Sequence, residues 1–119
     1  MSEPEISNFN TIIKEIIKKS LFTERQIEII LKQKKLLDVE FGVSKGAYYR
    51  QVAQSRSKVE SVYYTLILLQ AYDVILPDSD VISRLAEQVN VMKDGGFAPE
   101  NEDQIMNVIQ KAVKQLVGV

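Results

Sequence analysis

The sequence predicts an all-α protein, a single-domain bundle of about five to six helices over residues 1–119. Three observations support this fold class. Apolar residues recur at spacings of three and four, the period of an amphipathic helix, along most of the chain. Several of these segments begin with a helix-capping pattern. No segment alternates apolar and polar residues as a half-buried strand would.

The first predicted helix has one apolar face, and a capping pattern marks the start of the second. The apolar side chains of the first helix are Ile6, Phe9, Ile12, Ile13, Ile16 and Ile17. Thr23 and Gln26 form a capping-box pattern, in which each side chain accepts the backbone N–H of the other residue. Phe22 and Ile27 flank this start at the spacing of a hydrophobic staple, so the second helix should begin after Thr23.

A third helix is predicted to begin at Ser44. Gly42 tolerates the positive φ angle of a tight turn, and the Ser44 hydroxyl can accept a backbone N–H from the turn that follows. Ser57 and Glu60 repeat the capping-box spacing, which predicts a break before a fourth helix.

The fourth predicted helix is apolar nearly all round over residues 62–76, which predicts the central, buried helix of the bundle. This run is shorter than the ~20 residues that span a bilayer, so no membrane association is expected. Pro77 should end the helix. Two more helices should follow, with acidic caps at residues 78–80, a glycine–proline loop at 94–99 and a capping-box-like start at 101–104.

The composition excludes several classes of chemistry. The chain contains no cysteine and no histidine, which removes disulfides, thiolate nucleophiles, the usual zinc ligands and the commonest general base. The sequence also lacks a glycine-rich phosphate loop and a nucleophile elbow. We therefore expect no enzymatic activity, no metal and no cofactor. The polar, acidic first residues predict no leader peptide, and a cytoplasmic location is expected.

The net charge of −1 conceals an uneven distribution. From Lys14 to Lys58 the chain has eleven basic and five acidic residues, whereas the remainder has four basic and eleven acidic residues. The basic segment suggests a surface that meets a polyanion, although charges that only solubilise helix faces would give the same count. A solvated helix face is expected from Lys32, Lys34 and Lys35.

Within the basic segment, LLDVEFGVSKGAYYRQV has the order of parts of a helix-turn-helix. Residues 36–41 would form a short support helix, in which Asp38 would have to point to solvent, and Gly42 would make the turn. Tyr48 and Val52 would face inward from the second helix, because they are four residues apart. We assign DNA contacts to Ser44, Lys45, Gly46, Tyr49, Arg50, Gln54, Arg56 and Lys58.

Each of these residue types has a use at a DNA groove. Ser44 and the amides of a helix N-terminus can bind a phosphate, and Gly46 permits close approach of the backbone. Lys45 and Arg50 can neutralise phosphates or donate to guanine, and Tyr49 can donate to a phosphate or pack on a thymine methyl group. The alternative is that this segment is an ordinary helix start in a bundle that binds no ligand.

The stretch GVSKGAYYRQV resembles the turn and recognition helix of helix-turn-helix DNA-binding proteins, in particular site-specific recombinases and the fourth region of sigma factors. FTERQIEIIL is similar to the helix that begins this domain in sigma-like archaeal regulators. The resemblance implies base and phosphate contacts through Ser44, Lys45, Gly46, Tyr49 and Arg50. The chain departs from the pattern in its short support segment and in Tyr48, where valine or isoleucine is usual.

The sequence thus predicts a small DNA-binding protein, a transcriptional regulator or a nucleoid-associated factor, with double-stranded DNA as its partner and a recognition helix at residues 44–56. The basic, helix-turn-helix-like part would span residues 22–58, and an acidic helical part residues 59–119. Helix-turn-helix proteins commonly dimerise to match two half-sites. We therefore expect a homodimer that pairs through the helix at residues 62–76 or through the last helix. The alternative is a helical adaptor that binds an acidic partner protein and no nucleic acid.

Overall fold

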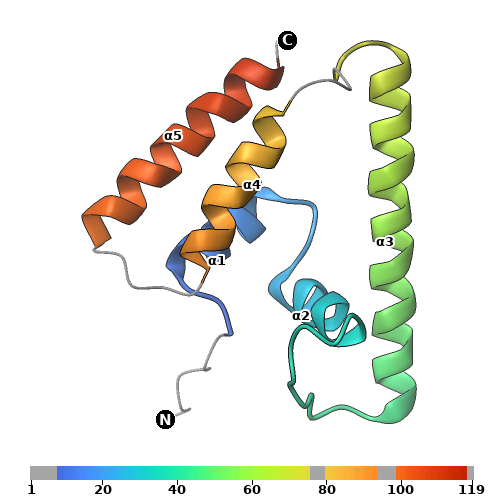
Figure 1. Ribbon diagram of the computed structural model, residues 1–119. Coiled ribbons are helices and arrows are strands. Elements are labelled where there is room, and N and C mark those ends of the chain that lie inside the picture. The colour runs from blue at the N-terminus through green and yellow to red at the C-terminus, as the bar shows by residue number, and fades with distance from the viewer. Residues whose placement is uncertain (1–7, 76–79, 94–98, 118–119) are drawn as a thin grey trace. The chain divides into compact units, whose positions relative to one another are not determined.

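The computed structural model describes residues 8–75, 80–93 and 99–117, without the side chains of residues 99 and 100 (Figure 1). All regular structure in these ranges is helical, which confirms the all-α class. The helices are α1 (Thr11–Lys19), α2 (Glu24–Gln33), α3 (Lys45–Ala71), α4 (Val81–Met92) and α5 (Pro99–Val117). None of them has the combination of length and hydrophobicity that a bilayer span requires.

The chain separates into two compact units. The first unit comprises Met1–Ile16 and Leu69–Val119, and it contains most of α1 together with α4 and α5. The second unit comprises Ile17–Leu68, and it contains α2 and most of α3. That all 119 residues form one domain stays a prediction.

Apolar side chains from three helices hold the first unit together. Ile12 of α1, Met92 of α4, and Met106 and Ile109 of α5 form its buried cluster. Partly buried side chains pack around the cluster from Ile13, Ile16, Leu85, Val89 and Ile105. Most of these positions belong to the apolar faces that the three-and-four spacing predicts, and their removal from water is the main stabilising contribution here.

Asn10 connects the start of α1 to the end of α4. Its Oδ1 accepts the Ile13 N–H at 3.0 Å, as an N-cap does, and its Nδ2 donates to the Met92 carbonyl at 2.7 Å. One side chain therefore satisfies a donor at one helix start and an acceptor at another helix end. Because α1 begins after Asn10, the predicted Phe9 precedes the helix, and the predicted Ile6 lies outside the described residues.

In the second unit, α2 begins as the sequence predicts. The Thr23 hydroxyl accepts the Gln26 N–H at 3.2 Å, and the Gln26 Oε1 accepts the Thr23 N–H at 3.0 Å. This pair of bonds confirms the capping box. Ile29, on the inward side of the helix, is fully buried.

The end of α2 forms without a glycine. The Leu36 N–H donates to the Leu31 carbonyl at 2.8 Å, and the Lys35 N–H donates to the Lys32 carbonyl at 3.0 Å. These are the two bonds of a Schellman motif. They place Lys35 at the position that normally takes glycine, with a φ of 59°. A residue with a Cβ costs about 1–2 kcal/mol in this left-handed conformation.

The predicted support helix at residues 36–41 is absent. The Schellman motif at Lys35 turns the chain out of α2, and residues 37–41 have no regular structure. Residues 34–44 instead form a loop that leads to α3, and Asp38 is exposed within it, as its charge requires. The helix that precedes α3 is therefore α2 itself, and the short turn of a helix-turn-helix is replaced by a longer loop.

The predicted break at Ser57 is also absent, because α3 runs through it without interruption. The Ser57 carbonyl accepts the Ser61 hydroxyl at 3.1 Å, and the Ser61 carbonyl accepts the Thr65 hydroxyl at 2.7 Å. A Ser-x-x-Glu pattern caps a helix only where the chain before it is not helical, and residues 53–56 contain neither glycine nor proline. The predicted third and fourth helices are thus one helix of 27 residues.

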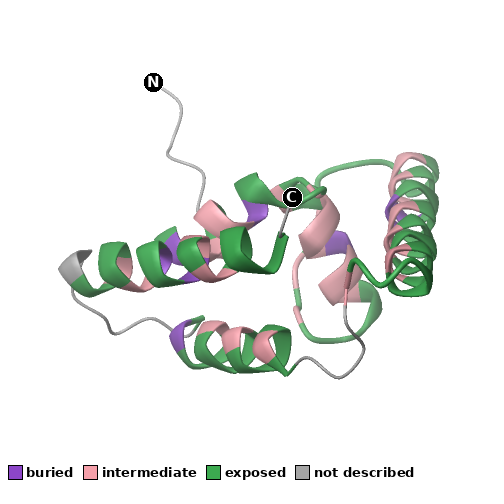
Figure 2. Cartoon of the chain, turned by 90° about the horizontal axis from the view of Figure 1, so that it is seen from above, coloured by how far each residue is buried: buried purple, intermediate pink, exposed green. Residues whose placement is uncertain are grey.

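The second half of α3 is not the buried centre that the sequence predicts. Figure 2 shows exposed residues along much of α3, at the right of the view. Tyr63 and Ile67 are each 64% exposed, Tyr64 is 73% exposed and Leu68 is 57% exposed. Only a narrow stripe is half-buried, formed by Val59, Val62, Leu66 and Leu69. An apolar composition predicts that a helix is buried, but it does not identify the surface that covers the helix.

Three helix ends differ from the predictions. α3 ends at Ala71, where a second Schellman motif gives Asp73 a φ of 59°, and Pro77 lies outside the described residues, as do residues 78–79 and 94–98. Asp80 precedes α4 but makes no side-chain cap bond. α5 begins at Pro99, two residues before the predicted start, because the fixed φ of proline suits the first helical position.

Lys35→Gly should stabilise the protein, because glycine adopts a positive φ without the steric cost of a Cβ. We expect the free energy of unfolding to rise by about 0.5–1 kcal/mol, measured by urea denaturation followed by circular dichroism. Lys34→Gly is the matched control, since Lys34 has a φ of −86° and glycine relieves no strain there. A Lys35→Gly protein no more stable than wild type would contradict the strained helix end.

Candidate nucleic-acid interface

Ser44 caps α3 as predicted. Its Oγ accepts the Ala47 N–H at 3.2 Å, and its carbonyl accepts the Tyr48 N–H at 2.9 Å. Ser44, Lys45 and Gly46 are all exposed, so the first turn of the helix is open to solvent. A Cβ added at Gly46 would meet nothing within 4 Å. Packing therefore does not require glycine at this position, and the backbone is accessible from outside.

One side of the first turns of α3 carries most of the predicted DNA contacts. We name these residues the outer face of α3: Lys45, Gly46, Tyr49, Arg50 and Gln54. All five are exposed, and Tyr49 is exposed over 58% of its surface. At about 100° per residue, they point away from the fully buried Ser55, with Lys45 at the edge of the face.

The two remaining predicted DNA contacts, Arg56 and Lys58, lie in different environments. Arg56 is exposed and lies about three turns beyond Lys45, on the same edge of the helix. Lys58 is turned toward α2, where its Nζ donates to the Gln26 Oε1 at 3.1 Å and lies 5.5 Å from the centre of the Phe22 ring. Lys58 faces α2 because α3 is unbroken, and the helical period therefore places residue 58 on the inward side.

A group of aromatic and cationic side chains, here called the Phe41 cluster, fixes the loop before α3. The Phe41 ring stacks on the Tyr48 ring, with centroids 6.0 Å apart and an interplanar angle of 27°. The Arg25 guanidinium lies 4.5 Å over the Phe41 ring, and the Lys32 Nζ lies 5.4 Å from the centroids of both rings. Such cation–π contacts contribute about 0.5–1 kcal/mol each at exposed sites. The cluster joins α2, the loop and the first turn of α3.

Lys32 is not the solvated side chain that the sequence predicts. Its Nζ donates to the Val39 carbonyl at 2.6 Å, and the residue is partly buried. Lys34 and Lys35 are exposed, in agreement with the prediction. Sequence reasoning missed this role because no local pattern shows that the loop returns across α2. The aromatic residues on either side of Gly42 were the only available signal.

The inward side of α3 contacts α2 as the spacing of Tyr48 and Val52 predicts. Val52 is buried, and the half-buried Tyr48 accepts a hydrogen bond on its hydroxyl from the Gln33 Nε2 at 2.7 Å. Ser55 and Ile29 are each 1% exposed and line the same groove between the two helices. The small serine side chain lets the helices approach closely at this point.

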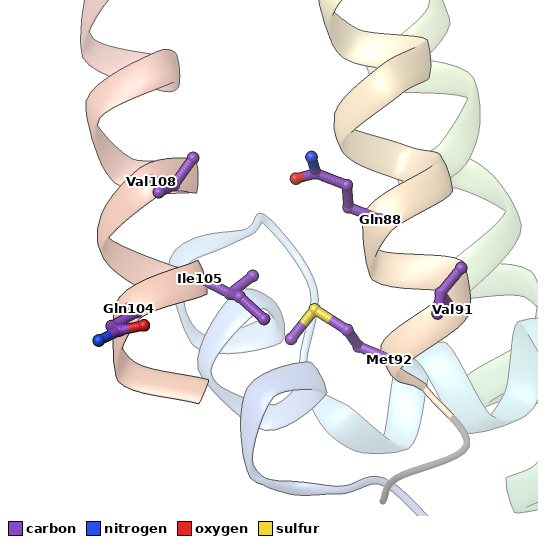
Figure 3. A pocket seen from close by; sticks show the side chains of 6 residues that line it. All are labelled: Gln88, Val91, Met92, Gln104, Ile105 and Val108. Atoms are coloured by element: carbon purple, nitrogen blue, oxygen red, sulfur yellow. The ribbon is translucent and has the colours of Figure 1, made fainter. Parts of the chain in front are cut away.

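Grooves between the helices lie apart from the outer face of α3. One of about 470 Å³ runs between α2 and α3, lined by apolar and polar side chains of both helices, among them the charged Lys34, Arg56 and Glu60. Another of about 470 Å³ lies between α4 and α5, where Figure 3 shows Met92 and Ile105 pointing toward one another. Among the residues described, no group of three or more acidic side chains could hold a metal ion.

The two units carry opposite net charges. Ile17–Leu68 contains ten basic and five acidic residues, a net +5, whereas Met1–Ile16 and Leu69–Val119 together contain five basic and eleven acidic residues, a net −6. The basic segment in the sequence, Lys14–Lys58, thus begins three residues before the second unit and ends ten residues before its last residue. The outer face of α3 carries two of the basic residues and no acidic one.

Comparison of the chain with known proteins produced no match among family models, curated proteins or solved structures. The candidate interface therefore rests on the residues, contacts and charges of this chain alone.

Lys32→Met should destabilise the second unit, because methionine keeps the length of the side chain but lacks the ammonium that bonds Val39 and faces the Phe41 and Tyr48 rings. We expect the free energy of unfolding to fall by about 1–2 kcal/mol in urea denaturation. The matched control is Lys34→Met, an exposed position where the change should stay within about 0.5 kcal/mol. Equal effects in the two variants would show that the cluster does not anchor the loop.

Proposed function

We propose that this protein binds double-stranded DNA through the outer face of α3, as a small transcriptional regulator or a nucleoid-associated factor. One observation carries the proposal: an exposed helix start at Ser44, with basic and neutral side chains around it, lies in a unit of net charge +5. A polyanionic duplex is the partner that fits this combination best.

In this proposal the first turn of α3 supplies the phosphate contacts. Backbone N–H groups at a helix N-terminus, together with the positive end of the helix dipole, attract a phosphate. The open space beside Gly46 would allow the phosphate to come close to the backbone. Lys45 would add a positive charge next to it, at the edge of the outer face.

Base contacts would come from the following two turns. The Arg50 guanidinium can donate two hydrogen bonds to guanine, and the Gln54 amide can pair with adenine in the same way. The exposed Tyr49 ring can pack on a thymine methyl group, or its hydroxyl can donate to a phosphate. These side chains occupy successive turns on one side of α3, which is the arrangement that a major groove requires.

The supporting role falls to α2 in this proposal. The Phe41 cluster and the hydrogen bond between Gln33 and Tyr48 hold α2 against the start of α3. A fixed support matters because a mobile recognition helix loses conformational entropy on binding, which weakens the affinity. Kinship with helix-turn-helix regulators is part of the proposal, and it rests on the resemblance of the two sequence stretches.

The exposed apolar side chains in the second half of α3 favour a second candidate, a helical adaptor that binds a partner protein. Salt separates the two candidates. Phosphate contacts release counterions from DNA, so the affinity for a duplex must fall steeply as salt rises. The adaptor would bind a partner protein and no duplex, so it would show no salt-dependent affinity for DNA.

Binding to a mixed-sequence duplex should be measurable by fluorescence anisotropy at low salt. With three to four phosphate contacts, the affinity should fall about 40–150-fold between roughly 50 and 200 mM salt. The double variant Lys45→Ala/Arg50→Ala should weaken binding at least about tenfold and reduce the slope of log affinity against log salt by about 1, because Lys45 makes a phosphate contact and Arg50 a base contact.

The matched control is Lys111→Ala/Lys114→Ala, which removes the same charge from two exposed positions on α5. Its affinity should stay within about twofold of wild type, because a charge in the first unit makes no phosphate contact. A complete lack of binding at low salt would overturn the proposal and favour the adaptor. An equal loss in both double variants would refute the assignment to α3.

A further inference from the structure

We propose that the protein forms a homodimer through an uncharged apolar surface on the second half of α3. This surface, here called the α3 patch, consists of Tyr63, Tyr64, Ile67 and Leu68. All four side chains are more than half exposed, although they are among the largest apolar residues of the chain. The dimer follows from the patch itself and does not depend on the proposed DNA binding.

The shape of the α3 patch suits a second copy of the same helix. Tyr63 and Ile67 are four residues apart, as are Tyr64 and Leu68, so they form two neighbouring ridges along the helix. Ridges of this spacing interlock with the same ridges of another helix at an angle of about 50°. A two-fold interface needs a surface that complements itself, and paired ridges of this type meet that requirement.

The absence of charge also favours self-association. Residues 61–72 contain no aspartate, glutamate, lysine or arginine, although these types make up 26% of the chain. In a two-fold dimer, a side chain near the axis faces its own copy, so any charge there would repel an identical charge. The patch avoids that repulsion along the exposed half of an otherwise charged helix. A partner protein of opposite charge would gain nothing from this surface.

The size of the α3 patch is compatible with a stable contact. From their exposed fractions, the four side chains present on the order of 500 Å² of surface, given that a tyrosine contributes about 150–250 Å². A standard interface buries about 800 Å² on each partner. The patch would thus supply the apolar centre, and the exposed Glu60, Ser61 and Thr65 beside it would supply a polar rim.

Sedimentation equilibrium without DNA tests the dimer directly. Wild-type protein should approach twice the 13.5 kDa chain mass as its concentration rises. Ile67→Glu should raise the dissociation constant about a hundredfold or more, since two glutamates would face each other across the axis. Ile82→Glu is the matched control, because Ile82 is a 51% exposed isoleucine on α4, and this variant should still dimerise. Circular dichroism should show that both variants keep wild-type helicity.

Disulfide trapping gives a second readout that a folding defect would not mimic. The chain has no cysteine, so Leu68→Cys introduces a single thiol. Mild oxidation should link Leu68→Cys chains into dimers much faster than Ile82→Cys chains. Wild-type protein that stays monomeric at high concentration would overturn the proposal and show that the α3 patch is covered within its own chain or by another partner. A dimer that survives Ile67→Glu unchanged would overturn it as well.

Discussion

The contact of the Lys32 ammonium with the Phe41 and Tyr48 rings and with the Val39 carbonyl fixes the loop between α2 and α3, on which the position of the candidate site depends. Residues 34–44 form an irregular loop, and a fixed path for such a loop costs conformational entropy. The Phe41 cluster offsets part of that cost because it joins the loop to both helices. It also sets where α3 begins beside α2, and hence which side chains of α3 face outward.

Local patterns predicted the helix starts in this unit, whereas the helix ends and the path of the loop needed tertiary information. The caps at Thr23 and Ser44 could be predicted because a cap involves only neighbouring residues. The end of α2 could not be predicted in this way. Glycine is the residue that usually marks a left-handed helix end, but here Lys35 occupies that position. The break predicted at Ser57 is wrong for a different reason. Ser57 and Glu60 have the spacing of a capping box, but they lie inside a helix that nothing interrupts.

The exposure of the candidate residues was predicted better than the extent of the helix that carries them. The outer face of α3 follows from helical period once the cap at Ser44 is fixed, so Tyr49 and Arg50 are exposed as expected. The prediction for Lys58 assumed a helix break at Ser57. The helix is unbroken there, and Lys58 lies against α2 instead. One unbroken helix therefore links the two surfaces that we propose, a basic outer face near its start and the uncharged α3 patch further on, at a separation set by the helical rise.

Mapping of backbone amide shifts by NMR during titration with a mixed-sequence duplex tests the central claim most directly, because it locates the DNA on the chain. Low salt is the right condition, since phosphate contacts are strongest there. The proposal predicts shifts that are largest at residues 44–54 and absent from α5. Shifts confined to α4 and α5, or no shift at a molar excess of DNA, would contradict it.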